Sequence, residues 1–156
     1  ICLAQHGWAA PGVDMVPEAL AEARRRATEA GVQATFVEGD VTRLAELGLE
    51  SGFGVLVDAG CFHTLPASAR DAYVDGVTEL AATGATMLLF GFGRGRFAPI
   101  RAGVSPDEVR DRFHRWSLEE AGRFSPFELL EEAGSRPVAA RVGNVFDLWH
   151  FRLQRL

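Results

Sequence analysis

The sequence predicts an α/β protein in which a mostly parallel sheet is flanked by helices. Apolar runs that suit strands alternate with segments of helical periodicity along most of the chain. The run 53–60 (FGVLVDAG) is apolar almost throughout, as expected for a parallel strand covered on both faces. The 156 residues can form one domain with a substantial core, so we expect a single domain over 1–156.

Proline and capping residues mark where several of the expected elements begin. Pro17 suits the first turn of a helix, and Ser105 can cap a helix that has Pro106 at its first position. Pro11 cannot donate to a strand ladder, which places its segment at an edge or a bulge. The segment 115–124 suits a strand or a helix. The expected elements are a helix end at 1–4, strands at 8–13, 32–38, 53–60 and 85–93, helices at 17–30, 66–82, 105–113 and 125–134, and a strand at 145–156.

The composition is that of an ordinary soluble globular protein, with 47% hydrophobic and 24% charged residues. No window is long and apolar enough for a membrane span, and no signal-peptide layout is visible, so we expect a cytoplasmic protein with no membrane partner. The net charge is −5, and the consecutive Arg24 to Arg26 are flanked by Glu18, Glu22 and Glu29, which form arginine–glutamate pairs at helical spacings. This pattern indicates a solvated helix face, so we expect no nucleic-acid partner.

Aspartates follow the ends of two successive strands, at Asp14 and Asp40. In open α/β sheets, ligands bind beyond the carboxyl ends of the strands. An acid that closes one strand can accept hydrogen bonds from the paired hydroxyls of a ribose, and an acid on the neighbouring strand can accept one from an exocyclic amine. Taken singly, each aspartate is more often a helix cap or a turn residue. Together, at successive strand-to-helix junctions, the two fit a nucleoside.

Three stretches, "GVDMVPEALAEARRRATEAGV", "FVEGDVTRL" and "VDAGCFHTLP", resemble the class I S-adenosylmethionine-dependent methyltransferases. The resemblance covers nearly the whole chain and is to the small-molecule branch similar to thiopurine and tellurite methyltransferases. It implies a Rossmann-like fold, S-adenosyl-L-methionine as the cofactor and a small-molecule acceptor. It also implies that Asp14 holds the ribose with Met15 beside the adenine, that Asp40 contacts the adenine amine with Val41 against the ring, and that Ala59 and Gly60 line the methionine side.

The turn after the strand 53–60 also carries His63, the candidate catalytic residue. An imidazole can act as a general base near neutral pH, which methyl transfer needs when the acceptor holds its proton. The alternative is that His63 orients the turn or only packs. Both alternatives are open at this point.

The family's first strand, and the glycine-rich loop that follows it, have no counterpart in this sequence. That strand is normally central, so its two neighbours would have unpaired edges, and we expect the sheet to be N-terminally incomplete. Residues preceding Ile1, or a second copy of the chain in a homodimer, could occupy the position. We therefore expect these 156 residues alone to be a poor methyltransferase. The alternative is a truncated or degenerate Rossmann-like module that serves binding or assembly without catalysis.

Short-chain dehydrogenases share some of these features, with an Asp-Val pair near the adenine and a small turn after the fourth strand. Their chemistry requires a tyrosine followed four positions later by a lysine. The one tyrosine of this chain is Tyr73, position 77 is a valine and the sequence contains no lysine. Dehydrogenase catalysis of this kind is therefore excluded.

Overall fold

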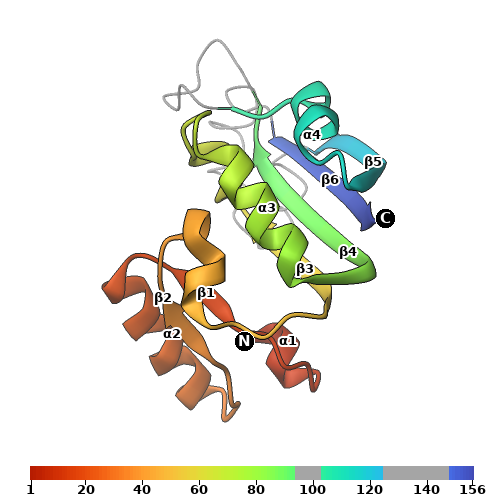
Figure 1. Cartoon of the computed structure of the whole chain (residues 1–156). Coiled ribbons are helices and arrows are strands. Elements are labelled where there is room, and N and C mark those ends of the chain that lie inside the picture. The colour runs from red at the N-terminus through yellow and green to blue at the C-terminus, as the bar shows by residue number, and fades with distance from the viewer. Residues whose placement is uncertain (94–102, 125–147) are drawn as a thin grey trace. The chain divides into compact units, whose positions relative to one another are not determined.

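The computed structural model describes residues 1–93, 103–124 and 148–156 and divides the chain into two compact units, Ile1–Leu49 and Glu50–Leu156. Figure 1 shows the helices and strands of both units. The helix expected at 125–134 and the start of the strand expected at 145–156 lie outside the described residues. The single domain over 1–156 stays a prediction.

The first unit is built around a pair of parallel strands joined by a helix. Strand β1 (Gly12–Asp14) pairs in parallel with β2 (Phe36–Glu38), and helix α2 (Pro17–Glu29) connects them (Figure 1). The ladder begins at Gly12, so β1 is shorter than the strand expected at 8–13, because Pro11 has no N–H to donate. The unit is completed by the short helix α1 (Cys2–Gln5) and the 3-10 helix η1 (Val41–Leu47).

Helix α2 follows the predicted pattern closely. It begins with Pro17, and the chain leaves it at Gly31, whose φ of +66° suits glycine. Leu20 is buried on its inner face. On the outer face, Arg25 bonds Glu22 and a second glutamate one turn away, and Arg26 bonds Glu22, at the helical spacings expected. Arg24 instead donates to the backbone carbonyl of Phe36.

The second unit contains a four-stranded sheet in the order β3-β4-β6-β5. The two strands β3 and β4 are parallel, and β6 runs antiparallel to both of its neighbours (Figure 1). The α/β class is therefore as predicted. Two of the described strand pairs, β1–β2 and β3–β4, are parallel, and two, β4–β6 and β5–β6, are antiparallel. The segment 115–124, which suits a strand or a helix in sequence, forms the strand β5. The elements are β3 (Phe53–Ala59), the 3-10 helix η2 (Phe62–Thr64), α3 (Arg70–Leu80), β4 (Ala81–Phe92), α4 (Pro106–Arg112), β5 (Trp116–Phe124) and β6 (Leu148–Arg155).

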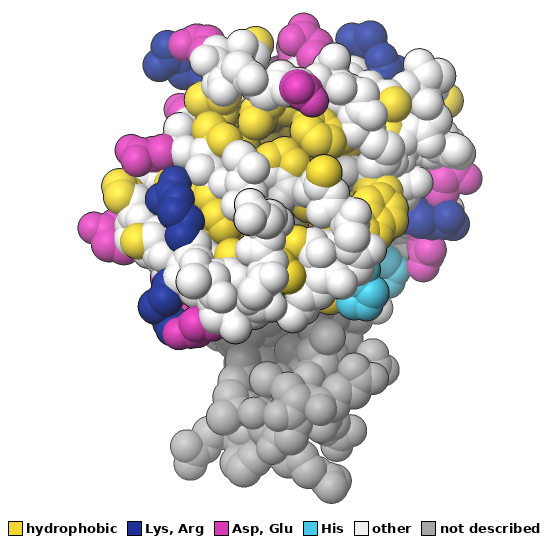
Figure 2. Space-filling view, turned by 90° about the horizontal axis from the view of Figure 1, so that it is seen from below, with side chains coloured by type: hydrophobic (Ala, Val, Ile, Leu, Met, Phe, Trp, Pro, Cys, Tyr) yellow, Lys and Arg dark blue, Asp and Glu magenta, His cyan; other side chains and the backbone are white. Residues whose placement is uncertain are grey.

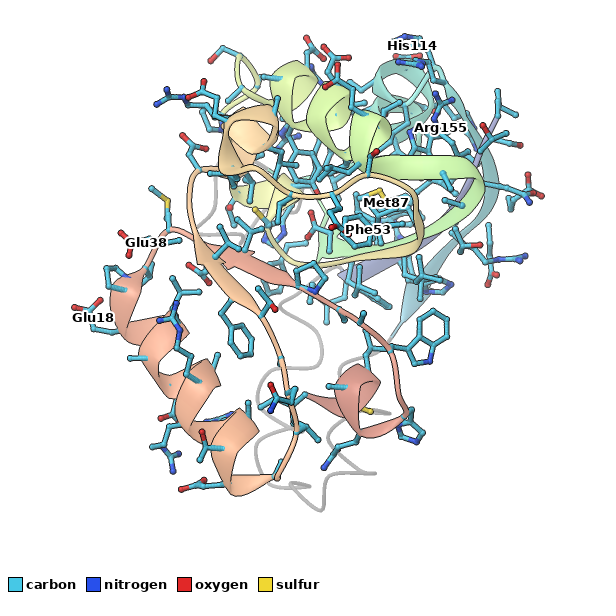
Figure 3. All side chains as sticks on the ribbon, turned by 60° about the horizontal axis from the view of Figure 1, so that its bottom comes forward. Glu18, Glu38, Phe53, Met87, His114 and Arg155 are labelled. Atoms are coloured by element: carbon cyan, nitrogen blue, oxygen red, sulfur yellow. The ribbon has the colours of Figure 1, made fainter. Side chains whose placement is uncertain are left out.

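Helix α3 lies against the sheet and supplies one side of the core (Figure 1). Its residues Tyr73 and Val77 are buried, and Met87 of β4, labelled in Figure 3, is 1% exposed. The indole N–H of Trp116 donates to the hydroxyl of Thr78 at 2.8 Å, which satisfies a buried donor and joins β5 to α3. The helix is shorter than the predicted 66–82, because Ala81 already belongs to β4.

Each sheet ends in unpaired edge strands in the part of the chain that the structure describes. Strand β1 pairs with β2 alone, and β3 pairs with β4 alone. Large apolar side chains near these edges are exposed, Met15 to 69% and Val57 to 52%. Figure 2 shows hydrophobic side chains at the surface of one face. What pairs with these strands stays a prediction.

A membrane-spanning segment was not expected from the sequence. Among the helices within 1–93, 103–124 and 148–156, none has the length and apolar character needed to cross a bilayer.

The turn that follows β3 is organised by the carboxylate of Asp58, which is 4% exposed. Its Oδ1 accepts hydrogen bonds from the backbone N–H groups of Gly60 at 2.9 Å and Cys61 at 2.6 Å. Its Oδ2 accepts from the N–H of Phe62 at 2.9 Å and from the hydroxyl of Tyr73 at 2.6 Å. The carboxylate therefore fixes the turn and joins it to α3. Burial, followed by the charge of Asp58, raises the pKa of Tyr73 well above its ordinary value, so the phenol keeps its proton.

Replacing Asp58 with asparagine should destabilise the fold strongly. The amide would present an N–H₂ donor where four donors now converge, and each hydrogen bond to a buried charge contributes about 1.5–3 kcal/mol. We expect Asp58→Asn to lower the free energy of unfolding by about 3 kcal/mol or more, and Tyr73→Phe, which removes one donor, by about half as much. Urea unfolding measures both changes. Asp75→Asn, at an exposed site on α3, is the matched control, and an equal midpoint for Asp58→Asn and this control would contradict the assignment.

Candidate functional site

The two aspartates expected to hold a nucleoside lie at the same end of the β1–β2 sheet. In the parallel register Asp14 is beside Glu38, and Asp40 follows two residues later. The N–H of Gly39 donates to the carbonyl of Asp14 at 3.0 Å, which keeps the two strand ends together. In Figure 3, Glu38 lies on the same side of this unit as Glu18, in the first turn of α2. The structure therefore brings the two predicted aspartates to one edge.

Each of these aspartates uses one carboxylate oxygen locally. Oδ1 of Asp14 accepts from the N–H of Val16 at 2.9 Å, and Oδ1 of Asp40 accepts from both the N–H and the hydroxyl of Thr42 at 2.8 Å. The N–H bond, followed by the hydroxyl bond, lowers the pKa of Asp40, which keeps it ionised at neutral pH. In both residues, Oδ2 accepts no hydrogen bond from the described residues, and both side chains are exposed. The turn-forming role and a ligand-binding role are therefore compatible in the same residue.

Apolar side chains follow both aspartates. Met15 is 69% exposed, which is unusual for a large apolar side chain, and Val41 is half-buried at the start of η1. An exposed apolar group beside an acid can cover the face of a flat ring while the acid binds its polar edge.

Three further predicted residues lie at the carboxyl end of β3 in the second unit. Ala59 is the exposed last residue of the strand, and Gly60 has a φ of +105°, a conformation that favours glycine. A Cβ atom at Gly60 would lie 3.3 Å from Cε1 of His63, and one at Gly91 would lie 3.1 Å from its Cβ. The two glycines therefore leave room for the imidazole at the ends of β3 and β4.

His63 itself is buried, with 3% of its surface exposed, and its ring meets Phe92 edge-on at 5.1 Å between centroids. Neither ring nitrogen has a hydrogen-bond partner among the described residues, whereas buried polar groups in proteins are nearly always bonded. Burial lowers the pKa of His63; the Asp58 carboxylate opposes this effect and the Arg70 guanidinium adds to it. The ring is therefore neutral at pH 7, and it both packs against Phe92 and keeps a nitrogen that can accept a proton.

Sequence reasoning missed two residues that shape this turn, Asp58 and Arg70. Arg70 is 2% exposed and bonds the carbonyl oxygens of Leu65 and His63 at 3.1 Å and 2.9 Å. A signal was present in both cases. Arg70 precedes Tyr73 by three residues and so lies on the apolar face of its helix, where a charge needs partners, and Asp58 closes a strand that is otherwise apolar.

This chain resembles known proteins in both sequence and structure. A family model described as a methyltransferase domain matches residues 1–84, which span the turns described above. The 2-heptyl-1-hydroxyquinolin-4(1H)-one methyltransferase of Mycobacteroides abscessus is 30% identical over an alignment of 123 residues, which covers 76% of this chain and 53% of that protein. The chain thus spans about half the length of this curated relative.

Two solved structures illustrate the likeness in fold. The Burkholderia thailandensis 1,6-didemethyltoxoflavin-N1-methyltransferase, with its substrate and S-adenosylhomocysteine bound, has a TM-score of 0.68 and 16% identity, over 97% of this chain and 63% of that one. The magnesium protoporphyrin IX methyltransferase of Synechocystis, with S-adenosylmethionine bound, has a TM-score of 0.70 and 19% identity, over 100% of this chain and 64% of that one. At these identities the likeness shows the Rossmann-like fold that the sequence predicts. The match over 1–84 covers more than half of the chain, which therefore belongs to the methyltransferase-domain family.

Proposed function

We propose that this protein transfers a methyl group from S-adenosyl-L-methionine to a small-molecule acceptor. The observation that carries the proposal is the pair Asp14 and Asp40, which lie at one end of two parallel strands, each with a carboxylate oxygen not used by the described residues. Membership of the methyltransferase-domain family adds the reaction class.

The chain's own residues fit the polar and apolar parts of this cofactor. Oδ2 of Asp14 is suited to accept from the ribose hydroxyls, and the ionised Asp40 is suited to accept from the adenine amine. Met15 and Val41 supply apolar surface for the ring. The small residues Ala59 and Gly60 would let the methionine part come close to the backbone after β3. When bound, S-adenosyl-L-methionine supplies an electrophilic methyl group on a positively charged sulfur.

His63 is the proposed general base. Its neutral ring can take the proton from an acceptor hydroxyl, and the two ring nitrogens have no partner among the described residues that would compete for it. The name of the Mycobacteroides abscessus relative specifies a ring hydroxyl on its acceptor, which supports the same class of acceptor here. We place the protein in the branch resembling thiopurine and tellurite methyltransferases, on the stretch "VDAGCFHTLP".

Replacing Asp14 with alanine should weaken cofactor binding. A hydrogen bond to a charged group contributes about 1.5–3 kcal/mol, so we expect the Kd for S-adenosylmethionine to rise about tenfold or more. Isothermal titration calorimetry on the full-length protein measures this change. Glu18→Ala removes a carboxylate from the same end of this unit and should leave the Kd unchanged. Equal affinities for Asp14→Ala and wild type would remove Asp14 from the site.

Replacing His63 with glutamine should slow methyl transfer to an acceptor that holds its proton. General-base catalysis contributes about 10² to 10⁴-fold, so we expect kcat to fall within that range for 2-heptyl-1-hydroxyquinolin-4(1H)-one as the first acceptor tested. Because the pKa of His63 is lowered, the wild-type rate should rise with pH through a value below 6.5 and then level off. The rise should be absent in His63→Gln.

The methylated product is followed by mass spectrometry, with His114→Gln, at an exposed histidine, as the control. A His63→Gln variant with the wild-type rate and pH profile would show that His63 is not the base. Absence of transfer to any hydroxylated acceptor by the wild-type protein would contradict the proposed activity.

A further inference from the structure

We propose that Arg70 is a positioning residue for His63, and that Glu108 shares this role by fixing Arg70 to helix α4. The inference rests on the proposed function, in which His63 acts as a base. It concerns the second unit alone.

The guanidinium of Arg70 joins two segments that follow neighbouring strands. After β3, it donates to the carbonyl of His63 at 2.9 Å and to that of Leu65 at 3.1 Å. In the segment that precedes α4, it donates to the carbonyl of Gly103 at 3.3 Å, and on α4 it bonds Glu108 at 2.7 Å. Its Cζ atom also lies over the Phe62 ring, 5.0 Å from the ring centroid. The buried guanidinium of Arg70 therefore links the turn after β3 to helix α4 and to the segment that precedes it.

Helix α4 presents Glu108 in a fixed position. The side chain of Glu108 is 9% exposed and also accepts from Arg112 at 3.1 Å, and Arg112 in turn bonds Asp71 on α3. The backbone N–H of Glu108 donates to the side chain of Ser105, which caps the helix. The position of the Glu108 carboxylate is therefore set by α4 and not by the turn after β3.

The contacts of the imidazole make its position depend on the bonds that Arg70 makes to the turn and to Glu108. The bond from Arg70 is made to the carbonyl of His63 itself, and the ring is confined by Gly91 and Phe92 on the adjacent strand. A small movement of the turn must therefore move the ring. A misplacement of about 1 Å at a catalytic group can lower a rate by about 100-fold.

Among the described residues, the charges that act on the His63 ring come from β3 and α3. Asp58 of β3 and Arg70 of α3 act directly on the ring, in opposite directions, and Tyr73 of α3 and Glu108 of α4 bond those two groups. A ring released from its buried position would gain water, and its pKa would rise towards the ordinary value. The pH titration of the His63 ring therefore shows whether the ring occupies its buried position, and this measurement needs neither cofactor nor acceptor.

The test uses Arg70→Lys, which keeps the charge but loses the fork of donors, and Glu108→Ala, which leaves Arg70 in place. The controls are Arg110→Lys and Asp107→Ala, at an exposed ion pair on the same helix, with 58% and 90% of the side chains exposed. The ring ¹⁵N signals of His63 are followed by NMR as the pH is varied. For both test variants we expect the His63 signals to shift and their titration midpoint to rise, with wild-type behaviour in both controls.

In the full-length enzyme, both test variants should lower kcat about tenfold while the Kd for S-adenosylmethionine stays within twofold of wild type. The inference is overturned if the His63 signals of folded Arg70→Lys and Glu108→Ala coincide with those of wild type, or if the controls shift them equally. Should Arg70→Lys fail to fold, Glu108→Ala decides alone. Shifted His63 signals in a protein without methyl transfer would support the positioning role and contradict the proposed function.

Discussion

The carboxylate of Asp58 is the interaction on which the rest of the second unit depends. It gathers four donors at the end of β3, three from the turn and one from Tyr73 on α3. Because an apolar strand cannot satisfy the N–H groups of a tight turn, one buried charge takes over that task. These bonds restrain the turn, and the position of His63 depends on it.

The two units handle their charges differently. In the first, Asp14 and Asp40 are exposed and use one oxygen each for the local turn. In the second, Asp58 and Arg70 are buried, and their hydrogen bonds to neighbouring residues stabilise the fold. The His63 ring is also buried, and its nitrogens have no hydrogen-bond partner among the described residues. Acids that keep an oxygen available suit a polar ligand, and a neutral buried imidazole suits proton transfer.

Local sequence patterns predicted the elements that local interactions determine. Helix α2 has a proline at its start and a glycine just after its end, and β3 is apolar except for Asp58, so the sequence predicts both close to their actual bounds. The local pattern of segment 115–124 suits both a strand and a helix. Its strand conformation depends on pairing with β6, more than twenty residues away along the chain. Tertiary pairing overrides weak local preference in such cases.

The candidate site likewise has features that the sequence predicts and features that depend on contacts between distant residues. The adjacency of Asp14 and Asp40 could be predicted, because the carboxyl ends of neighbouring parallel strands meet at one edge. The role of Arg70 could not, because its partner Glu108 lies 38 positions further along the chain. The burial of His63 was likewise not visible in the sequence, since it depends on Gly91 of the neighbouring strand.

The central claim is the proposal that the aspartates at the ends of β1 and β2 bind the cofactor. Hydrogen–deuterium exchange of the full-length protein, with and without S-adenosylhomocysteine, tests it most directly. The account predicts slower exchange at residues 13–16 and 39–42 when the ligand is bound, with little change in the last turns of helix α2. Protection confined to other segments, or none at saturating ligand, would contradict it.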